Sequence, residues 1–456
     1  MRRFGFFILV LAGCSTSAPR PPLPALATVV QPSFEEPPLA AIPEHSRRSP
    51  QFWAQQGTER QFIVLEHDAS VGVAFLVMPS SAERHVEGMS VEIGAESVAR
   101  RVPAGCATWS DSGRLFRAIM IRCPTETLGA GIAELSGFAR EPVLETALFR
   151  IGSQTYLQSI LDLAYSAPAR TRIVARQTLY GAEDPKARDA RTVLAALQSV
   201  KRSEVRDALE QLVSRSAIVV AGMIDAEDVD GLQLEPGSAA PRRLAVPDST
   251  WTNTVREGAW DIGAFFTRSE QTYLRVLHHG PAPNSDDYWA FVLLAEVLTD
   301  AYTSPGAVLR HSQGASYGVR SELVQFGDAT ELSWGGYVEN ARALAALDAH
   351  QQSLRDILSG TVNAAALARA KRRAEVRELE MLTTAMGTAR LYAERWAIGL
   401  DLTDPSSQLR AVAPEDLIEV ARKYINAEAL VVAIEGAPAY WTLNSRGEVE
   451  TFQVIE

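Results

Sequence analysis

The chain has 456 residues, which is enough for two or three domains, and its 46% hydrophobic and 22% charged residues are ordinary for a globular protein. Its formal net charge of −11 at pH 7 argues against a broad basic face, so we expect no nucleic-acid partner and no polybasic attraction to anionic lipid. The one basic run, 371–373, lies among glutamates and indicates an exposed turn of helix.

The N-terminus has the pattern of a lipoprotein signal. Arg2 and Arg3 precede a short apolar run, and small residues lead directly to Cys14. The run is far shorter than the roughly 18 residues that span a bilayer. We therefore predict that residues 1–13 are a signal peptide and that Cys14 carries a lipid anchor, with an ordinary signal peptide as the alternative. Ser15 follows the cysteine, and by resemblance to Gram-negative lipoproteins a serine at this position favours the outer membrane. We therefore expect the protein to be anchored in the cell envelope and to face the periplasm.

The segment after the cysteine is rich in proline. Residues 15–50 contain nine prolines and have neither helical nor strand period. Proline-rich linkers are extended and semi-rigid. We therefore predict that residues 14–50, with the lipid anchor at their start, form a tether that holds the folded body away from the membrane.

A first folded domain is predicted at 51–231. Short runs of Val, Ile and Phe indicate strands, and apolar residues three and four apart indicate helices. The strands are expected at 61–66, 71–78, 98–109, 114–122 and 217–222, and the helices at 125–139, 143–164, 187–197 and 203–214.

Two cysteines remain beside the one expected to be lipidated. An oxidising compartment permits a bond between Cys106 and Cys123. They flank an expected hairpin whose turn is 110–113, and that register pairs Cys106 with a residue near Arg117, short of Cys123. The sequence therefore leaves the disulfide open.

The second part of the chain repeats the first in outline. Residues 232–258 have no clear period and contain three prolines, which indicates an interdomain linker before a domain at 259–456. Strands are expected at 260–268, 272–278, 316–325, 330–338 and 430–435, and helices at 286–301, 305–313, 341–358, 364–396 and 414–424. Both parts run strands, helices and a last strand. The fold class expected is therefore α+β, with two similar α/β sandwich domains, each an antiparallel-rich sheet covered by helices.

Several motifs of the second part follow one another in a known order. They are the leucine-rich 293–298, Ser304, Leu309-Arg310, the run Gly314-Ala315-Ser316-Tyr317-Gly318-Val319, then 412–417, 420–424 and 431–436. This order resembles the insulinase/pitrilysin family of zinc metallopeptidases. Residues 179–181, 203–214 and 219–225 fit the end of its catalytic-type domain more loosely. The resemblance covers roughly residues 58–440.

The zinc motif of that family is missing. Its peptidases carry H-x-x-E-H on a helix after the second strand, where two histidines hold zinc and the glutamate is the base on its water. No two of the seven histidines are four residues apart, and His278 and His279 would lie on opposite faces of a strand. Only His85, followed by Glu87 and Gly88, lies in the expected region, and 79–97 looks too short for the zinc-bearing helix. We expect no metal in this chain.

The resemblance retains Arg310 and Tyr317. In the family, such a pair faces the zinc from the second domain, and some two-chain members have zinc in one chain and this pair in the other. A permanently charged guanidinium and a hydroxyl donor suit the oxyanion of peptide hydrolysis. Taken singly, Arg310 could be an exposed cation at the C-terminus of a helix, where the helix dipole favours it. Tyr317 could be present only because tyrosine is common in strands. The resemblance implies a heterodimer in which zinc lies in the partner chain and the substrate is a peptide.

The leading hypothesis is therefore a non-catalytic subunit of a heterodimeric zinc metallopeptidase. The alternative is a catalytically inactive peptide-binding or scaffold lipoprotein of the same fold. An autonomous hydrolase is disfavoured because the sequence has no G-x-S-x-G, no cysteine/histidine pairing and no cluster of metal ligands. Trp334, Tyr337 and Trp396 are expected to be packing aromatics, and Asp225 a turn residue.

Overall fold

The computed structural model describes residues 49–454 with internal gaps. The gaps are 59, 80–84, 112–115, 165, 225–227, 229–230, 238–260, 267–268, 301–303, 308–317, 327–328, 403–404 and 437–452. Five sequence predictions fall outside the described residues: the signal peptide, Cys14 with its tether, Asp225, Arg310 and Tyr317.

The first half is built on a seven-stranded sheet, sheet A. Its strands are β1 (Gln51–Gln55), β2 (Gln61–Leu65), β3 (Val71–Pro79), β4 (Ala107–Asp111), β5 (Phe116–Pro124), β6 (Ala217–Ala221) and β7 (Leu234–Pro236). Their order is β4-β5-β3-β6-β2-β1-β7, and only β2 and β6 pair in parallel. Strand β7 lies in the stretch expected to be linker, and it pairs with β1.

The second half is built on sheet B, which has the same topology. Its strands are β8 (Asp261–Phe266), β9 (Gln271–Gly280), β10 (Gly318–Gln325), β11 (Thr330–Glu339), β12 (Val431–Gly436) and β13 (Gln453–Val454). The order β10-β11-β9-β12-β8 repeats β4-β5-β3-β6-β2, with β8 and β12 as the parallel pair in place of β2 and β6. The repeated topology confirms the prediction of two similar antiparallel-rich halves.

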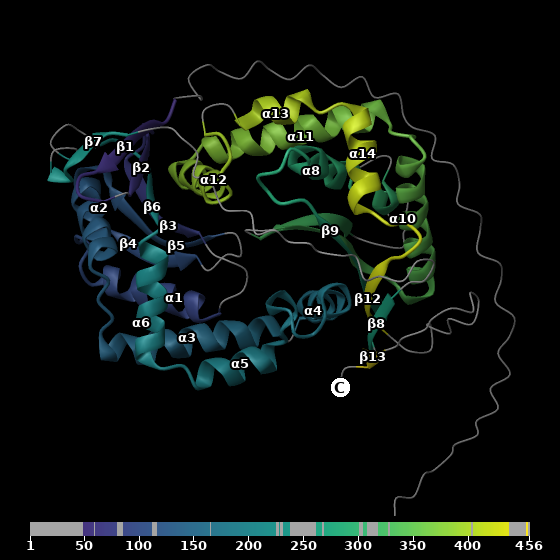
Figure 1. Cartoon of the computed structure of the whole chain (residues 1–456), viewed down its shortest axis with the longest axis horizontal. Helices are drawn as coiled ribbons and strands as arrows, with labels where there is room; N and C mark the ends of the chain where they lie inside the picture. Colours follow the sequence, from purple (N-terminus) through teal and green to yellow (C-terminus); the bar gives the residue numbers. More distant parts are fainter. Residues whose placement is uncertain are drawn as a thin grey trace, which may run out of the picture.

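Helices cover both sheets (Figure 1). The first half has α1 (His85–Ala99), α2 (Thr125–Arg140), α3 (Thr146–Ala164), α4 (Ala167–Tyr180), α5 (Ala190–Gln198) and α6 (Arg202–Val213), and the second has α8 (Tyr288–Val297), α10 (Ala343–Leu358), α11 (Ala364–Leu382), α12 (Ala385–Ala397), α13 (Pro405–Ala411) and α14 (Pro414–Tyr424). Short 3-10 turns lie at Pro185–Ala187 and Asn340–Arg342. No described helix is both long and apolar enough to cross a membrane.

The helix predictions differ from the structure in four places, one of which is the short helix α13 (Pro405–Ala411), which was not predicted. The stretch 79–97 does hold a long helix, α1, and residues to Ala99 are not strand. Its residues are buried on nearly every side, including Gly88 and Gly94, so no amphipathic period marks it. Helix α4 was missed, although Ser166 caps it by accepting from the Ala169 amide. The helix expected at 364–396 breaks at Thr384, which caps α12 through the Gly387 amide.

The hairpin of β4 and β5 corrects the expected register. Asp111 pairs with Ala118 and Ala107 with Arg122, whereas the expected register would have paired Cys106 with a residue near Arg117. The observed register brings Cys106 opposite Cys123, and the two form a disulfide. The covalent link ties the start of β4 to the end of β5 beside the packed helix α2.

Each half also covers the inner face of the other half's sheet. The outer face of sheet A packs on α1, α2 and α6, and that of sheet B on α8, α10, α11 and α14. The inner face of sheet A is covered by α12 from the second half, through Ala389, Tyr392 and Trp396. The inner face of sheet B is covered by α4 from the first half, where Val174 and its neighbours meet Leu277. Figure 1 shows α12 beside the first half and α4 below β9.

Candidate functional site

The first candidate site is the beginning of α1, the helix that follows the second long strand. If Glu87 is taken as the glutamate of H-x-x-E-H, its histidines would stand at 84 and 88. The chain has Arg84 and Gly88 at those positions. Glu87 is therefore the one motif residue retained, and it is 4% exposed in the first turn of α1.

A cation lies beside this buried carboxylate. Arg117 extends from β5, and its Nε is 3.6 Å from Glu87 Oε2, with both side chains almost fully buried. Tyr156 from α3 is also buried, and its hydroxyl lies 3.4 Å from His85 Nδ1. A buried carboxylate is tolerated only when it is paired, and here a guanidinium supplies the positive charge.

Gly88 shows that these residues fill the place of a second histidine. A Cβ at Gly88 would lie 2.2 Å from the Tyr156 hydroxyl oxygen and 2.8 Å from Arg117 Nη1. No side chain fits there unless both neighbours move. The donor set on α1 therefore does not fit zinc, and the described residues contain no group of three or more His, Cys, Asp and Glu placed to hold a metal.

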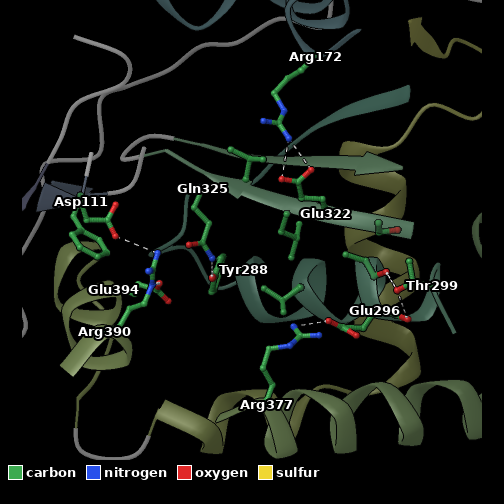
Figure 2. Close-up of a pocket in the computed structure, with 16 residues that line it drawn as sticks. Asp111, Arg172, Tyr288, Glu296, Thr299, Glu322, Gln325, Arg377, Arg390 and Glu394 are labelled. Atoms are coloured by element: carbon green, nitrogen blue, oxygen red, sulfur yellow. Dashed lines mark hydrogen bonds and ion pairs between the residues drawn. The ribbon is translucent and has the colours of Figure 1, made fainter. Parts of the chain in front are cut away.

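The second candidate site is a pocket of about 760 Å³ between the two halves. Figure 2 shows its walls: β10 and α8 from the second half, α12 and α11 beside them, and Arg172 of α4 with Asp111 of β4 from the first half. Thr299 and Ser321, the pocket residues on either side of 301–317, also belong to this lining. In the sequence, these two described residues flank the segment that contains Arg310 and Tyr317.

The charged side chains of the pocket are arranged in ion pairs, most of which join different elements. Arg390 lies 3.3 Å from Asp111 of the first half and 3.1 Å from Glu394 of its own helix. Arg377 Nη1 is 2.9 Å from Glu296 Oε1, and Arg172 joins Glu322 at 2.8 Å. Burial raises the pKa of the Glu394 carboxyl, and the hydrogen bond from Arg390 opposes that rise.

Two polar groups lie deeper in the same pocket. The Tyr288 hydroxyl accepts a hydrogen bond from the Gln325 side chain, which links α8 to β10 (Figure 2). Burial raises the pKa of Tyr288 well above its ordinary value, so this hydroxyl stays protonated at neutral pH. The pocket therefore offers neutral hydrogen-bonding groups inside and paired charges at its rim.

The other residues singled out in the sequence are mostly structural. Trp334 is fully buried in the core of the second half, and Trp396 is buried at the α12 contact, as expected. Tyr337 is instead 44% exposed and meets Tyr273 edge to face. His278 and His279 do lie on opposite faces, toward His350 and Tyr180 respectively.

Arg117 and Tyr156 were not anticipated in the sequence. They come from β5 and α3, far along the chain from Glu87. The one available signal was Gly88 in place of a histidine, because a glycine inside a helix usually marks close approach of another group.

The repeated sheets and their helices form a fold like that of M16, or insulinase/pitrilysin-type, peptidases, and the zinc motif of that family is absent from the sequence. Residues 214–374 match the sequence model of the family described as the Peptidase M16 inactive domain. A search of curated proteins gave no match. The similarity to the M16 inactive domain is thus found over residues 214–374.

Solved structures share its fold over most of its length. A protease from Helicobacter pylori superposes with a TM-score of 0.69 at 13% identity, covering 85% of this chain and 99% of that one. A putative M16-like peptidase from Alicyclobacillus acidocaldarius gives 0.68 at 13% identity, covering 85% and 98%. An M16 inactive domain from Pseudomonas fluorescens gives 0.65 at 14% identity, covering 85% and 98%. At these identities the likeness establishes the fold alone.

Proposed function

We propose that this chain is the non-catalytic subunit of a two-chain zinc metallopeptidase, and that it supplies Arg310 and Tyr317 to a peptide held at the zinc of its partner. The observation that carries the proposal is the beginning of α1. There Arg117 and Tyr156 fill the space of a metal ligand, while both halves of the fold and the pocket between them are kept. A chain with this pattern cannot supply the zinc itself and retains the surfaces that surround a substrate.

One further observation and a chemical argument support the role of the arginine and tyrosine. Thr299 and Ser321, which precede and follow them in the sequence, line the pocket. A guanidinium and a phenol that donate to a developing oxyanion lower the barrier of peptide hydrolysis.

We also propose that Cys14 anchors the chain to the cell envelope. Membrane fractionation of a Cys14→Ser variant tests this proposal, since serine cannot form the thioether and the variant should be released from membranes.

The experiment reconstitutes the pair. This chain is mixed with an exported M16 chain that carries H-x-x-E-H, and cleavage of a quenched peptide is compared for the wild type, Tyr317→Phe and Arg310→Ala. We expect turnover to fall about 100- to 1000-fold in each variant, since removal of one oxyanion donor costs that much. Tyr337→Phe is the matched control, because Tyr337 is exposed and does not line the pocket.

Two outcomes would contradict the proposal. Equal turnover by all four proteins at equal yield of complex would remove the catalytic role of Arg310 and Tyr317. Failure of any zinc-bearing chain to associate would favour the alternative, a peptide-binding or scaffold lipoprotein that works without a peptidase partner.

A further inference from the structure

Two buried histidines meet beneath α10, on the outer face of sheet B. His350 lies in the middle of the buried stripe of α10, and His278 lies on β9. Their ring centroids are 5.9 Å apart, and the His350 ring stacks on Trp334 of β11 with centroids 4.2 Å apart. His278 is 5% exposed and His350 is fully buried. The three rings thus join α10 to two strands of the sheet.

The ring nitrogens of this cluster are not hydrogen-bonded within the described part of the chain. Nε2 of His278, both ring nitrogens of His350 and Nε1 of Trp334 are buried and make no hydrogen bond to a described residue. A buried polar group without a partner costs free energy, and a buried charge without a partner costs far more. The surroundings therefore accept two neutral imidazoles and disfavour an imidazolium.

The charged groups of the surrounding elements are turned away from the two rings. Successive strand residues face opposite sides of a sheet, so the inner face of sheet B takes Arg275 and His279 of β9, Glu331 of β11 and Glu435 of β12. On the helices and turns around α10, the charged side chains are exposed or only partly buried: Asp287, Glu296, Glu339, Arg342, Asp348, Arg355, Asp356, Glu415, Asp416, Glu419, Arg422 and Lys423. The phenol of Tyr424 on α14 donates to Asp287. Each histidine therefore has the other as its titratable neighbour.

Burial lowers the pKa of both imidazoles. Desolvation lowers the pKa of His278 from 6.5 to about 4, and it lowers that of His350 well below 6.5, with the neighbouring His278 adding to the effect. A histidine whose folded pKa is lowered contributes stability that is complete above its unfolded pKa and is lost as the pH falls toward its folded pKa. For His278 this loss spans pH 6.5 to about 4.

We propose that His278 and His350 form an acid-sensitive latch, in which neutral imidazoles hold α10 against sheet B and protonation of either one releases the helix. Release brings the imidazolium into water while the strands of sheet B stay paired. The change reaches the pocket between the halves, because β11 carries Trp334 and pairs with β10, which lines that pocket. Acid thus removes the outer support of one pocket wall. The latch lies wholly in this chain and needs no zinc-bearing partner.

The first test measures hydrogen exchange of the α10 amides in the purified chain at pH 7 and pH 5, corrected for the intrinsic effect of pH on exchange. We expect the equilibrium constant for opening α10 to rise about 20-fold between these pH values, which follows from a pKa of 6.5 for His278 in the open state and about 4 in the closed state. Protonation of His350 adds to this rise.

Variants assign the effect to the two rings. The double variant His278→Leu, His350→Leu removes both titrating groups and keeps apolar side chains, so we expect its α10 to open equally at pH 7 and pH 5. His279→Leu is the matched control, because His279 lies on the same strand but meets Tyr180 on the opposite face. This control should keep the rise of the wild type.

The second test titrates the wild type by NMR with labelled histidine, so it does not depend on how well a variant folds. The resonances that disappear in His278→Leu and in His350→Leu assign the two rings. We expect both to titrate below about pH 5, while an exposed histidine titrates near its ordinary pKa of about 6.5.

The latch is overturned if both rings titrate near pH 6.5, or if wild-type α10 opens equally at the two pH values. An equal rise in the double leucine variant would also overturn it, because the acid sensitivity would then lie elsewhere. None of these results bears on the reconstituted cleavage that tests the subunit proposal, and loss of cleavage in Tyr317→Phe leaves the latch untouched.

Discussion

At the scale of single residues, the decisive feature is the missing side chain of Gly88. Glu87 is buried beside Arg117, and the Tyr156 hydroxyl oxygen lies 2.2 Å from the position that a Cβ at residue 88 would take. The ion pair with the Arg117 guanidinium offsets the free energy of desolvating the carboxylate. Helix α1 therefore packs against the sheet without a metal ligand at position 88. Restoring histidine at 88 is therefore expected to strain the helix and not to restore a metal site.

Gly88→Ala tests this packing. We expect it to lower the free energy of unfolding by about 1–3 kcal/mol, the usual cost of overpacking, as measured by urea unfolding. Gly137→Ala on α2 is the matched control, because a Cβ there meets nothing within 4 Å and alanine should stabilise the helix slightly. Gly88→His should be at least as destabilised as Gly88→Ala and should take up no zinc by elemental analysis. Equal stability of the two alanine variants would show that Tyr156 and Arg117 yield without cost.

The sequence indicated the loss of the zinc motif but not what replaced it. The spacing of the histidines was sufficient to show the loss, because H-x-x-E-H places its two histidines four residues apart on one helix face. The replacement depends on Arg117 and Tyr156, which reach α1 only through the register of β5 and the packing of α3. Single-sequence patterns carry no information on such tertiary neighbours.

At the scale of elements, α4 is joined to sheet B by three ion pairs. Arg170 pairs with Glu435 of β12, Arg172 with Glu322 of β10, and Arg176 with Glu331 of β11. Only the pair of Arg176 and Glu331 is fully buried. The contact of α12 with sheet A, by contrast, is mainly apolar. The two reciprocal contacts therefore differ in chemistry although the topology repeats.

The three pairs should contribute unequally to stability. Arg176→Ala leaves Glu331 buried without its cation, so we expect a loss of about 3–5 kcal/mol in urea unfolding. Arg172→Ala should cost about 0–1 kcal/mol, because its partner Glu322 is half exposed and solvent screens the pair. The double variant Arg176→Met, Glu331→Leu should recover most of the loss. If Arg176→Ala and Arg172→Ala lower the free energy of unfolding by similar small amounts, the buried pair contributes no more to stability than the exposed one.

Elements with a clear period were predicted and those without one were not. Strands β3, β5 and β9 are runs of apolar and β-branched residues, and α6 has a clean apolar stripe, so all four were found close to their observed bounds. Helix α1 is buried on nearly every side, and α4 presents arginines to another half of the molecule, so neither shows an ordinary amphipathic pattern. The disulfide was left open because the register expected for the hairpin paired Cys106 with a residue near Arg117, and the observed register brings it opposite Cys123.

At the scale of the whole molecule, the halves are joined by reciprocal coverage. Helix α12 buries Phe75, Val77 and Met120 on the inner face of sheet A, and α4 buries Leu277 on that of sheet B. The pocket takes residues from both contacting helices, Arg172 of α4 and Arg390 of α12, and from both halves. The site therefore depends on the joined state and not on either sheet alone.

This reciprocal coverage sets an order of events during synthesis. The strands and helices of the first half are all synthesised by residue 237, long before α12. Until α12 is synthesised, the inner face of sheet A stays exposed, and α4 has no sheet B to pack against. A nascent chain paused in that interval exposes apolar surface and is prone to aggregation. We expect a fragment of residues 49–260 to bind the dye ANS and to lack a cooperative melt, and a fragment of residues 261–456 added during refolding to remove the dye signal. A first fragment that melts cooperatively as a monomer would mean that the half matures without its complement.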